Sequence, residues 1–136
     1  MKKTIYLDYA AATYVLPEVL EVMMPYFEEK YGNPSSIHHK GQEARQAVDG
    51  ARAIVAKILH AEPREIIFTG SGTESDNLAI QGVFRAAVSG PFGESKLAKN
   101  KRPHIITSAV EHSAVLRTCE YLEKNYGCDV TYVEVD

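Results

Sequence analysis

The second half of the chain alternates short apolar segments with helical patterns, and this alternation constrains the fold more than any other feature. Three segments have the length and composition of β-strands: Glu65–Thr69, His104–Val110 and Asp129–Val135. Two segments between them have helical spacing: about 74–88, and about 113–125 with Gly127 at its end. Strands separated by helices are the signature of a parallel sheet. We therefore predict an α/β fold with a parallel-type sheet and flanking helices.

The N-terminal segment is predicted to hold an extended stretch and then a helix. Residues Thr4–Ala10 have the pattern of a short strand or an extended arm. Pro17 suits the first turn of a helix. One apolar face of that helix is marked by Val19, Leu20, Met23 and Phe27. Pro25 lies inside the pattern, so we expect it to kink the helix or to end it early.

A turn cluster, Tyr31–Ser36, separates this helix from a second and strongly periodic one. Ser36 is a candidate N-cap for the second helix, whose apolar spacing continues to His60. The one long irregular connection is Ser89–Arg102, which carries a basic cluster that we expect to be a solvated surface loop.

Composition excludes several classes of protein. The chain has 136 residues, 45% of them apolar and 24% charged, with a net charge of −3. This balance is typical of a folded domain and gives no general attraction to nucleic acid or to membrane surfaces. No apolar run approaches membrane-spanning length, and we identify no targeting segment. Two cysteines cannot make a disulfide framework, so we expect a cytoplasmic protein.

The turn Gly70-Ser71-Gly72-Thr73 joins a predicted strand to a predicted helix. The N–H groups of Gly72 and Thr73, with the Thr73 hydroxyl, could hold a phosphate at the helix N-terminus. The alternative is a structural turn in which Thr73 only caps its own helix. A P-loop is disfavoured because no lysine lies in 70–77. A dinucleotide fingerprint is disfavoured because Ser75 replaces its third small residue and Glu111 comes too late.

His112 follows the second predicted strand and should share a sheet edge with the Gly72–Thr73 turn, because carboxyl ends of parallel strands meet there. A histidine beside a phosphate site could stack on a cofactor ring or move a proton. The alternative is a histidine at a helix start that bonds nearby backbone. His38, His39 and His60 have no carboxylate or cysteine at metal spacing, so we predict no metal site.

Four stretches in the same order resemble the N-terminal part of cysteine desulfurases of the iron–sulfur cluster assembly type, which are class V, fold type I, pyridoxal-phosphate enzymes. They are "YLDYAAAT" (Tyr6–Thr13), "YGNPSSIH" (Tyr31–His38), "EPREIIFTGSGTESDNLAIQG" (Glu62–Gly82) and "HIITSAVEHSAVLRTCEYLE" (His104–Glu123). The resemblance covers nearly the whole chain; only the connection 89–102 is longer than the family pattern. It implies that residues 1–14 are an arm belonging to a small domain and that 15–136 begin the large cofactor-binding domain.

The resemblance also implies residue roles. Gly72 and Thr73 match the phosphate-binding pair for pyridoxal 5'-phosphate, and His112 matches the histidine that stacks on its ring and assists proton transfers. Asn33 lies in a segment that the family places near the active-site entrance, a weaker correspondence. Cys119 and Cys128 do not match the nucleophilic cysteine, which the family carries on a later mobile loop.

The activity implied is conversion of L-cysteine to L-alanine with formation of an enzyme persulfide, whose sulfur passes to an acceptor or scaffold protein. The full-length protein is expected to be a homodimer. The cofactor-linking lysine, the acidic partner of the ring nitrogen, the substrate-binding arginine and the nucleophilic cysteine belong to later family segments. We therefore expect a truncated, inactive N-terminal fragment. A related class V lyase or aminotransferase, and a non-catalytic binding or assembly fragment, remain alternatives.

Overall fold

The computed structural model describes residues 4–89 and 102–136. The chain divides into two compact units, Met1–Ile67 and Phe68–Asp136. No helix among the described residues is both long enough and apolar enough to cross a lipid bilayer. Lys96, Lys99 and Lys101 of the predicted basic loop lie outside the described residues. The predicted domain boundary after residue 14 stays a prediction.

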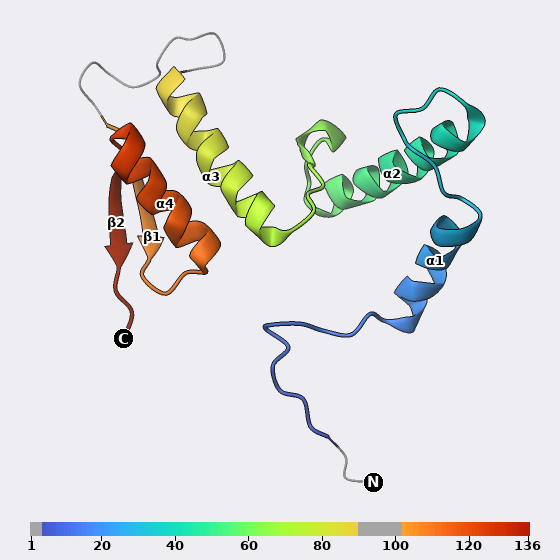
Figure 1. Cartoon of the computed structure of the whole chain (residues 1–136), viewed down its shortest axis with the longest axis horizontal. Coiled ribbons are helices and arrows are strands. Elements are labelled where there is room, and N and C mark those ends of the chain that lie inside the picture. Colours follow the sequence, from blue (N-terminus) through green and yellow to red (C-terminus); the bar gives the residue numbers. More distant parts are fainter. Residues whose placement is uncertain (1–3, 90–101) are drawn as a thin grey trace. The chain divides into compact units, whose positions relative to one another are not determined.

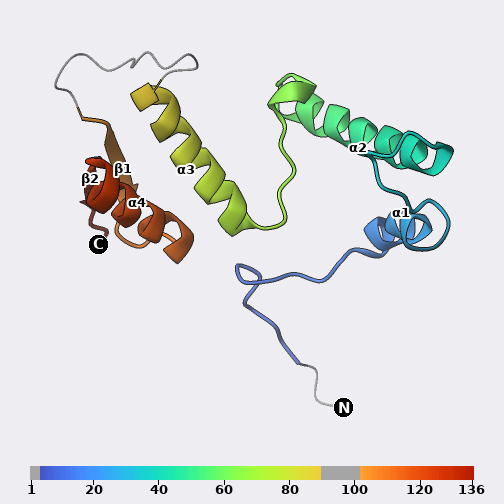
Figure 2. The same ribbon diagram turned by 45° about the horizontal axis from the view of Figure 1, so that its top comes forward.

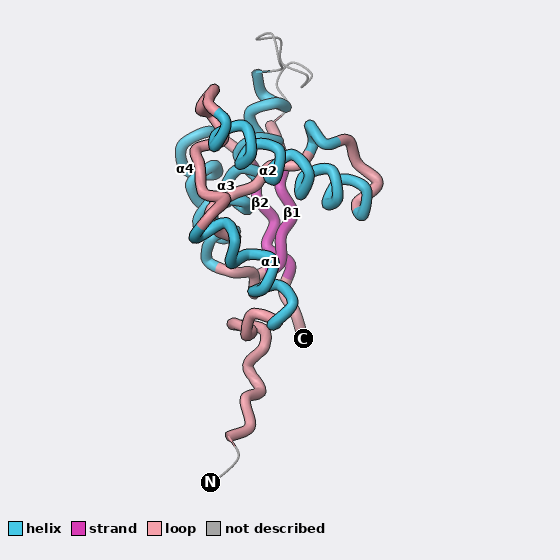
Figure 3. The backbone as a smooth tube through the Cα atoms, turned by 90° about the vertical axis from the view of Figure 1, so that its right-hand side faces the viewer, coloured by secondary structure: helices cyan, strands magenta, loops and turns pink. Residues whose placement is uncertain are grey.

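The second unit is built on two parallel strands, β1 (His104–Ser108) and β2 (Asp129–Val133). Their register pairs Ile106 with Thr131, and Figures 1 and 3 show the two strands side by side. Helix α4 (Ser113–Tyr126) connects them, which confirms the predicted strand–helix–strand arrangement. The predicted parallel α/β class is therefore correct for this unit.

Helix α3 (Gly72–Ser89) packs beside α4 in the same unit, as Figures 1 and 2 both show. The buried core consists of Phe84 from α3, Leu122 from α4 and Cys128, which precedes β2. Partly buried apolar side chains surround this core: Ile80, Val88, Ile105 and Val130. The core therefore fixes both helices against one face of the strand pair.

Gly127 ends α4 as the sequence predicts. Its φ of 65° is in the left-handed region, and its N–H bonds the Leu122 carbonyl oxygen. Glycine adopts this conformation without the steric cost that a Cβ brings. The cap turns the chain into β2 within two residues.

The predicted strand Glu65–Thr69 is not a strand in the structure. Pro63–Glu65 form a 3₁₀ turn, η1, in which the Glu65 carboxylate accepts the Glu62 N–H at 2.7 Å. Residues 66–69 are not assigned to a strand, and the described sheet is limited to β1 and β2. A strand needs a ladder of hydrogen bonds to a neighbour, and apolar composition alone does not supply one.

The first unit begins with an extended arm, and Thr4–Ala10 form no strand. Helix α1 (Pro17–Glu28) starts at Pro17 as predicted. Pro25 does not end it: the helix continues to Glu28, and the Glu29 and Lys30 N–H groups both bond the Pro25 carbonyl oxygen. Proline removes one N–H but retains a helical φ, so the turn that follows it survives.

Helix α2 (His39–Ile58) begins later than the sequence suggested. The N-cap is His38, whose Nδ1 accepts the Gly41 N–H at 3.3 Å, and not Ser36. Ser36 instead donates its N–H to the Asn33 carbonyl oxygen at 2.9 Å, inside the preceding turn. Leu59 ends the helix, and His60 has a φ of 53°.

Two glycines allow the turn 31–36 to lie directly against the start of α2. A Cβ placed on Gly32 would collide with the Lys40 carbonyl, and one on Gly41 with the Ser36 carbonyl. Both obstacles are backbone atoms, which cannot move as a side chain end can. Glycine is therefore a steric requirement at these two positions.

We predict that Gly41→Ala lowers the free energy of unfolding by about 1–3 kcal/mol, the usual cost of overpacking. Gly50→Ala is the matched control, since it lies in the same helix and its Cβ would meet nothing within 4 Å. That control should stabilise by about 0.5–1 kcal/mol through helix propensity. Thermal unfolding followed by circular dichroism compares them; equal stability of the two variants would contradict the close contact.

Candidate functional site

The turn before α3 is held by a reciprocal pair of hydrogen bonds. The Ser71 hydroxyl oxygen accepts the Glu74 N–H at 3.2 Å, and the Glu74 carboxylate accepts the Gly70 N–H at 2.8 Å. This arrangement is close to a capping box. Its sequence pattern, a serine followed three residues later by a glutamate, is present at Ser71 and Glu74. The suggestion that Thr73 caps α3 is therefore wrong, because Ser71 fills that role.

The capping by Ser71 leaves the hydrogen-bond donors of Gly72 and Thr73 unused. Within residues 4–89 and 102–136, no hydrogen bond is formed by the N–H of Gly72, the N–H of Thr73 or the Thr73 hydroxyl. A Cβ built on Gly72 would meet no atom within 4 Å, so the space beside the turn is open. Free N–H groups at a helix N-terminus suit an anion. The residues present fit a phosphate group.

His112 is the N-cap of α4. Its Nδ1 accepts the Ala114 N–H at 3.1 Å, and its carbonyl oxygen accepts the Val115 N–H at 2.9 Å. Because Nδ1 is an acceptor, the neutral imidazole carries its proton on Nε2. The capping role that the sequence offered as an alternative is thus present, and it fixes the tautomer of the ring.

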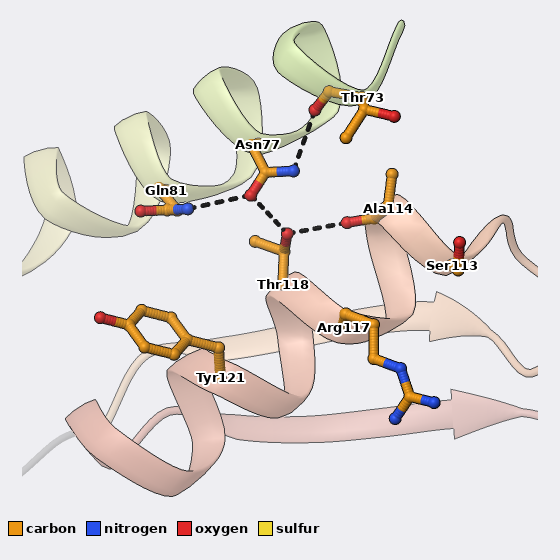
Figure 4. A pocket seen from close by; sticks show the side chains of 8 residues that line it. All are labelled: Thr73, Asn77, Gln81, Ser113, Ala114, Arg117, Thr118 and Tyr121. Atoms are coloured by element: carbon orange, nitrogen blue, oxygen red, sulfur yellow. Dashed lines mark hydrogen bonds between the residues drawn. The ribbon is translucent and has the colours of Figure 1, made fainter.

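The predicted cofactor residues Thr73 and His112 lie toward one edge of the strand pair. Figure 4 shows Thr73 and Ser113 at the same ends of their helices, toward which both strand arrows point. His112 directly precedes Ser113. The expected shared edge is therefore observed, since the N-termini of α3 and α4 meet at the carboxyl ends of the strands.

A surface hollow of about 490 Å³ extends between α3 and α4 from this edge. Figure 4 shows its lining side chains: Thr73, Asn77, Gln81, Ser113, Ala114, Arg117, Thr118 and Tyr121. Thr73 and Ser113 lie at one end, while the remaining residues follow the helices away from the edge. Neither Gly72 nor His112 lines it, so the hollow adjoins the open turn without including it.

Asn33 belongs to the first unit and serves its own turn. Its Oδ1 accepts the Ser35 N–H at 2.9 Å, in the manner of an Asx turn. This contact gives Asn33 a structural role, and a role at an active-site entrance stays a prediction. No group of three metal-ligating side chains occurs among the described residues.

Neither cysteine has the surroundings of a nucleophile. Cys119 is fully buried and Cys128 nearly so. Burial raises the pKa of the Cys119 thiol, and the nearby Glu123 carboxylate raises it further. Burial likewise raises the pKa of Cys128. A raised pKa lowers the fraction of reactive thiolate at neutral pH, which agrees with the expectation that neither cysteine is the nucleophile.

The sequence is similar to curated proteins along its whole length. It is 51% identical over 136 residues to cysteine desulfurase IscS of Dictyoglomus turgidum and 46% identical over 136 residues to cysteine desulfurase IscS of Clostridium botulinum. The comparison spans all of this chain but only 32% and 31% of those proteins. The chain therefore spans about a third of the length of the curated relatives it matches.

Solved structures give the same result for the fold. The chain superposes on SspA in complex with cysteine with a TM-score of 0.78 and 42% identity, covering 96% of this chain and 34% of that one. A NifS-like protein gives a TM-score of 0.76 and 40% identity, covering 95% and 32%. The family model for class-V aminotransferases matches residues 5–136. By its sequence, its parallel strand pair and these likenesses, the chain belongs to the class-V aminotransferase family.

Proposed function

We propose that this chain is the N-terminal part of a pyridoxal 5'-phosphate-dependent cysteine desulfurase. The observation that carries the proposal is the identity of 46–51% over all 136 residues to proteins named cysteine desulfurase. A solved structure with 42% identity is described in complex with cysteine, which supports L-cysteine as the substrate. The open turn at α3 supports a cofactor that carries a phosphate.

In this proposal, Gly72 and Thr73 hold the phosphate through two backbone N–H groups and one hydroxyl, at the positive end of the α3 dipole. The bound cofactor supplies an electron sink for reactions at the substrate α-carbon. His112 lies against the ring and holds or moves a proton at Nε2, because the Ala114 N–H occupies its Nδ1. The phosphate contact orients the ring for these steps.

The proposed reaction breaks the C–S bond of L-cysteine. An enzyme thiolate would attack the substrate sulfur and become a persulfide, while the β-carbon keeps the electron pair of the broken bond and takes a proton, which gives L-alanine. The thiolate, like the cofactor-linking lysine, comes from a part of the longer protein beyond this sequence. The buried Cys119 and Cys128 are unsuited to the role.

The remaining features of the proposal concern partners and location. The sulfur would pass to an acceptor or scaffold protein, such as one that assembles iron–sulfur clusters, and the longer protein would be a homodimer. Large apolar side chains of α1 are exposed, including Leu20, Met23 and Phe27, and these suit burial by further parts of such an assembly. The two free cysteines suit a cytoplasmic protein.

The function is tested with the longer protein that contains this sequence. With pyridoxal 5'-phosphate, L-cysteine and a thiol reductant, we expect alanine and sulfide in equal amounts. The 136-residue chain alone is the control, and borohydride reduction should leave no covalently attached cofactor on it. Amino-group transfer without sulfide release would contradict the desulfurase proposal and favour another class V activity.

We predict that Thr73→Val in the longer protein weakens cofactor binding about 10- to 100-fold, the cost of one hydrogen bond to a charged group. Valine preserves the shape of threonine, and α3 retains its Ser71 cap. Thr73→Ser restores the hydroxyl and should restore most of the affinity. The dissociation constant is measured by equilibrium dialysis of the apoprotein; an unchanged constant in the valine variant would remove Thr73 from the phosphate site.

His112→Asn separates the two roles of the histidine. Asparagine is a good N-cap, so α4 and the melting temperature should be preserved. Turnover should nevertheless fall about 10²- to 10⁴-fold, because the imidazole proton carrier is lost. His112→Ala, which removes both functions, serves as the comparison. Wild-type turnover in the asparagine variant would reduce His112 to a helix cap.

A further inference from the structure

A single hydrogen bond between side chains links α3 to α4 within the described residues. The Thr118 hydroxyl of α4 lies 2.8 Å from Oδ1 of Asn77 on α3. Thr118 is buried, with 4% of its surface exposed, whereas Asn77 is half-buried, so the contact is partly shielded from water beside the hollow that both residues line. Elsewhere the helices meet through apolar and aromatic side chains such as Phe84 and Leu122. Helix packing alone does not require a polar pair at such a position, since apolar residues of the same volume would serve.

On the α3 side, the Asn77 amide is fixed in one orientation. Its Nδ2 donates to the Thr73 carbonyl oxygen at 2.9 Å, and its Oδ1 accepts from Gln81 Nε2 at 3.1 Å. Figure 4 shows these bonds in line along the helix. A flipped amide would face its NH₂ toward that of Gln81 and its oxygen toward the Thr73 carbonyl, so the observed orientation is the satisfied one.

On the α4 side, the polar path continues to His112. The Thr118 hydroxyl is also 2.7 Å from the Ala114 carbonyl oxygen, and its single proton is shared between two acceptors. The Ala114 N–H in turn donates to His112 Nδ1. A chain of polar contacts through Asn77 and Thr118 therefore runs from the Thr73 backbone to the His112 ring.

We propose that Asn77 and Thr118 are positioning residues that set the separation between Thr73 and His112. The inference rests on the proposed function, in which Thr73 holds the phosphate and His112 faces the ring of one rigid cofactor. A sliding movement of α3 against α4 would move one contact relative to the other and tilt the ring. Sites of this kind need their groups held within about 0.5 Å. The Asn77–Thr118 bond adds a directional contact to the apolar packing of the two helices, and so narrows the register in which they can lie.

The test uses Thr118→Val in the longer protein, which removes the hydroxyl while nearly preserving volume. Thr118→Ser is the rescue variant. Thr131→Val is the matched control: it makes the same substitution in the same unit and removes a hydroxyl bonded to His104, away from both helices. Three properties are measured: the cofactor dissociation constant, the visible circular dichroism of the bound cofactor, and hydrogen exchange of residues 112–118 in the apoprotein.

We expect Thr118→Val to raise the dissociation constant about 3- to 10-fold, the range for loss of one ordinary hydrogen bond. It should also change the cofactor dichroism, which reports ring orientation, and accelerate exchange in the first turn of α4. Thr118→Ser should return all three toward wild type, and Thr131→Val should alter none of them. Asn77→Ala should give the same dichroism change, and combining it with Thr118→Val should add little.

Wild-type dichroism and affinity in Thr118→Val would overturn the positioning role, even if the melting temperature fell, because a purely structural bond would change stability alone. If the valine variant does not fold, failure of Thr118→Ser to retain wild-type dichroism likewise overturns it. Failure of the proposed function has a different signature: the wild-type protein would bind the cofactor but release no sulfide from L-cysteine. The dichroism comparison decides the positioning role in that case too.

Discussion

The parallel pairing of β1 with β2 is the constraint on which the site depends. Two parallel strands that are consecutive in the chain require a crossover, and α4 supplies it. The crossover returns the chain to the amino end of the sheet, so the N-terminus of α4 must lie at the carboxyl end of β1. Packing of Phe84 against the α4 side of the core then aligns α3 with α4. Both helix N-termini face the same edge as a result.

Different residues of the turn cap the helix and offer hydrogen-bond donors, and this makes that edge suitable for an anion. Ser71 and Glu74 cap the helix start, and the Gly72 and Thr73 donors have no partner among residues 4–89 and 102–136, so they can bind a ligand. At the second helix the cap is His112 itself, so one contact both starts α4 and sets the tautomer of the ring. The two helix starts therefore differ: one has spare donors, and the other presents an oriented imidazole.

Much of the second unit is predictable from sequence because its signals are local. The elements β1, α4 and β2 were predicted from strand composition, helical spacing and Gly127. The order of these elements along the chain then predicted the sheet edge shared by Thr73 and His112. The prediction of a strand at 65–69 was wrong because a strand forms only where a neighbouring strand pairs with it. Local composition carries no information about that neighbour. Two predicted helix caps were also wrong. Ser36 has a suitable side chain, but the backbone path places His38 at the start of α2. The cap of α3 is Ser71, which its spacing to Glu74 indicates, and not Thr73. No local sequence pattern indicates the Asn77–Thr118 bond, because it joins residues that are 41 positions apart.

In the proposed site, the turn before α3 holds the cofactor phosphate and the start of α4 faces the cofactor ring. An experimental structure of the longer protein with pyridoxal 5'-phosphate would show directly whether both contacts form. We expect phosphate oxygens at about 2.7–3.1 Å from the backbone nitrogens of Gly72 and Thr73 and the Thr73 hydroxyl, with the His112 ring against the cofactor ring. A phosphate bound elsewhere, with these donors facing solvent or other protein groups, would contradict it.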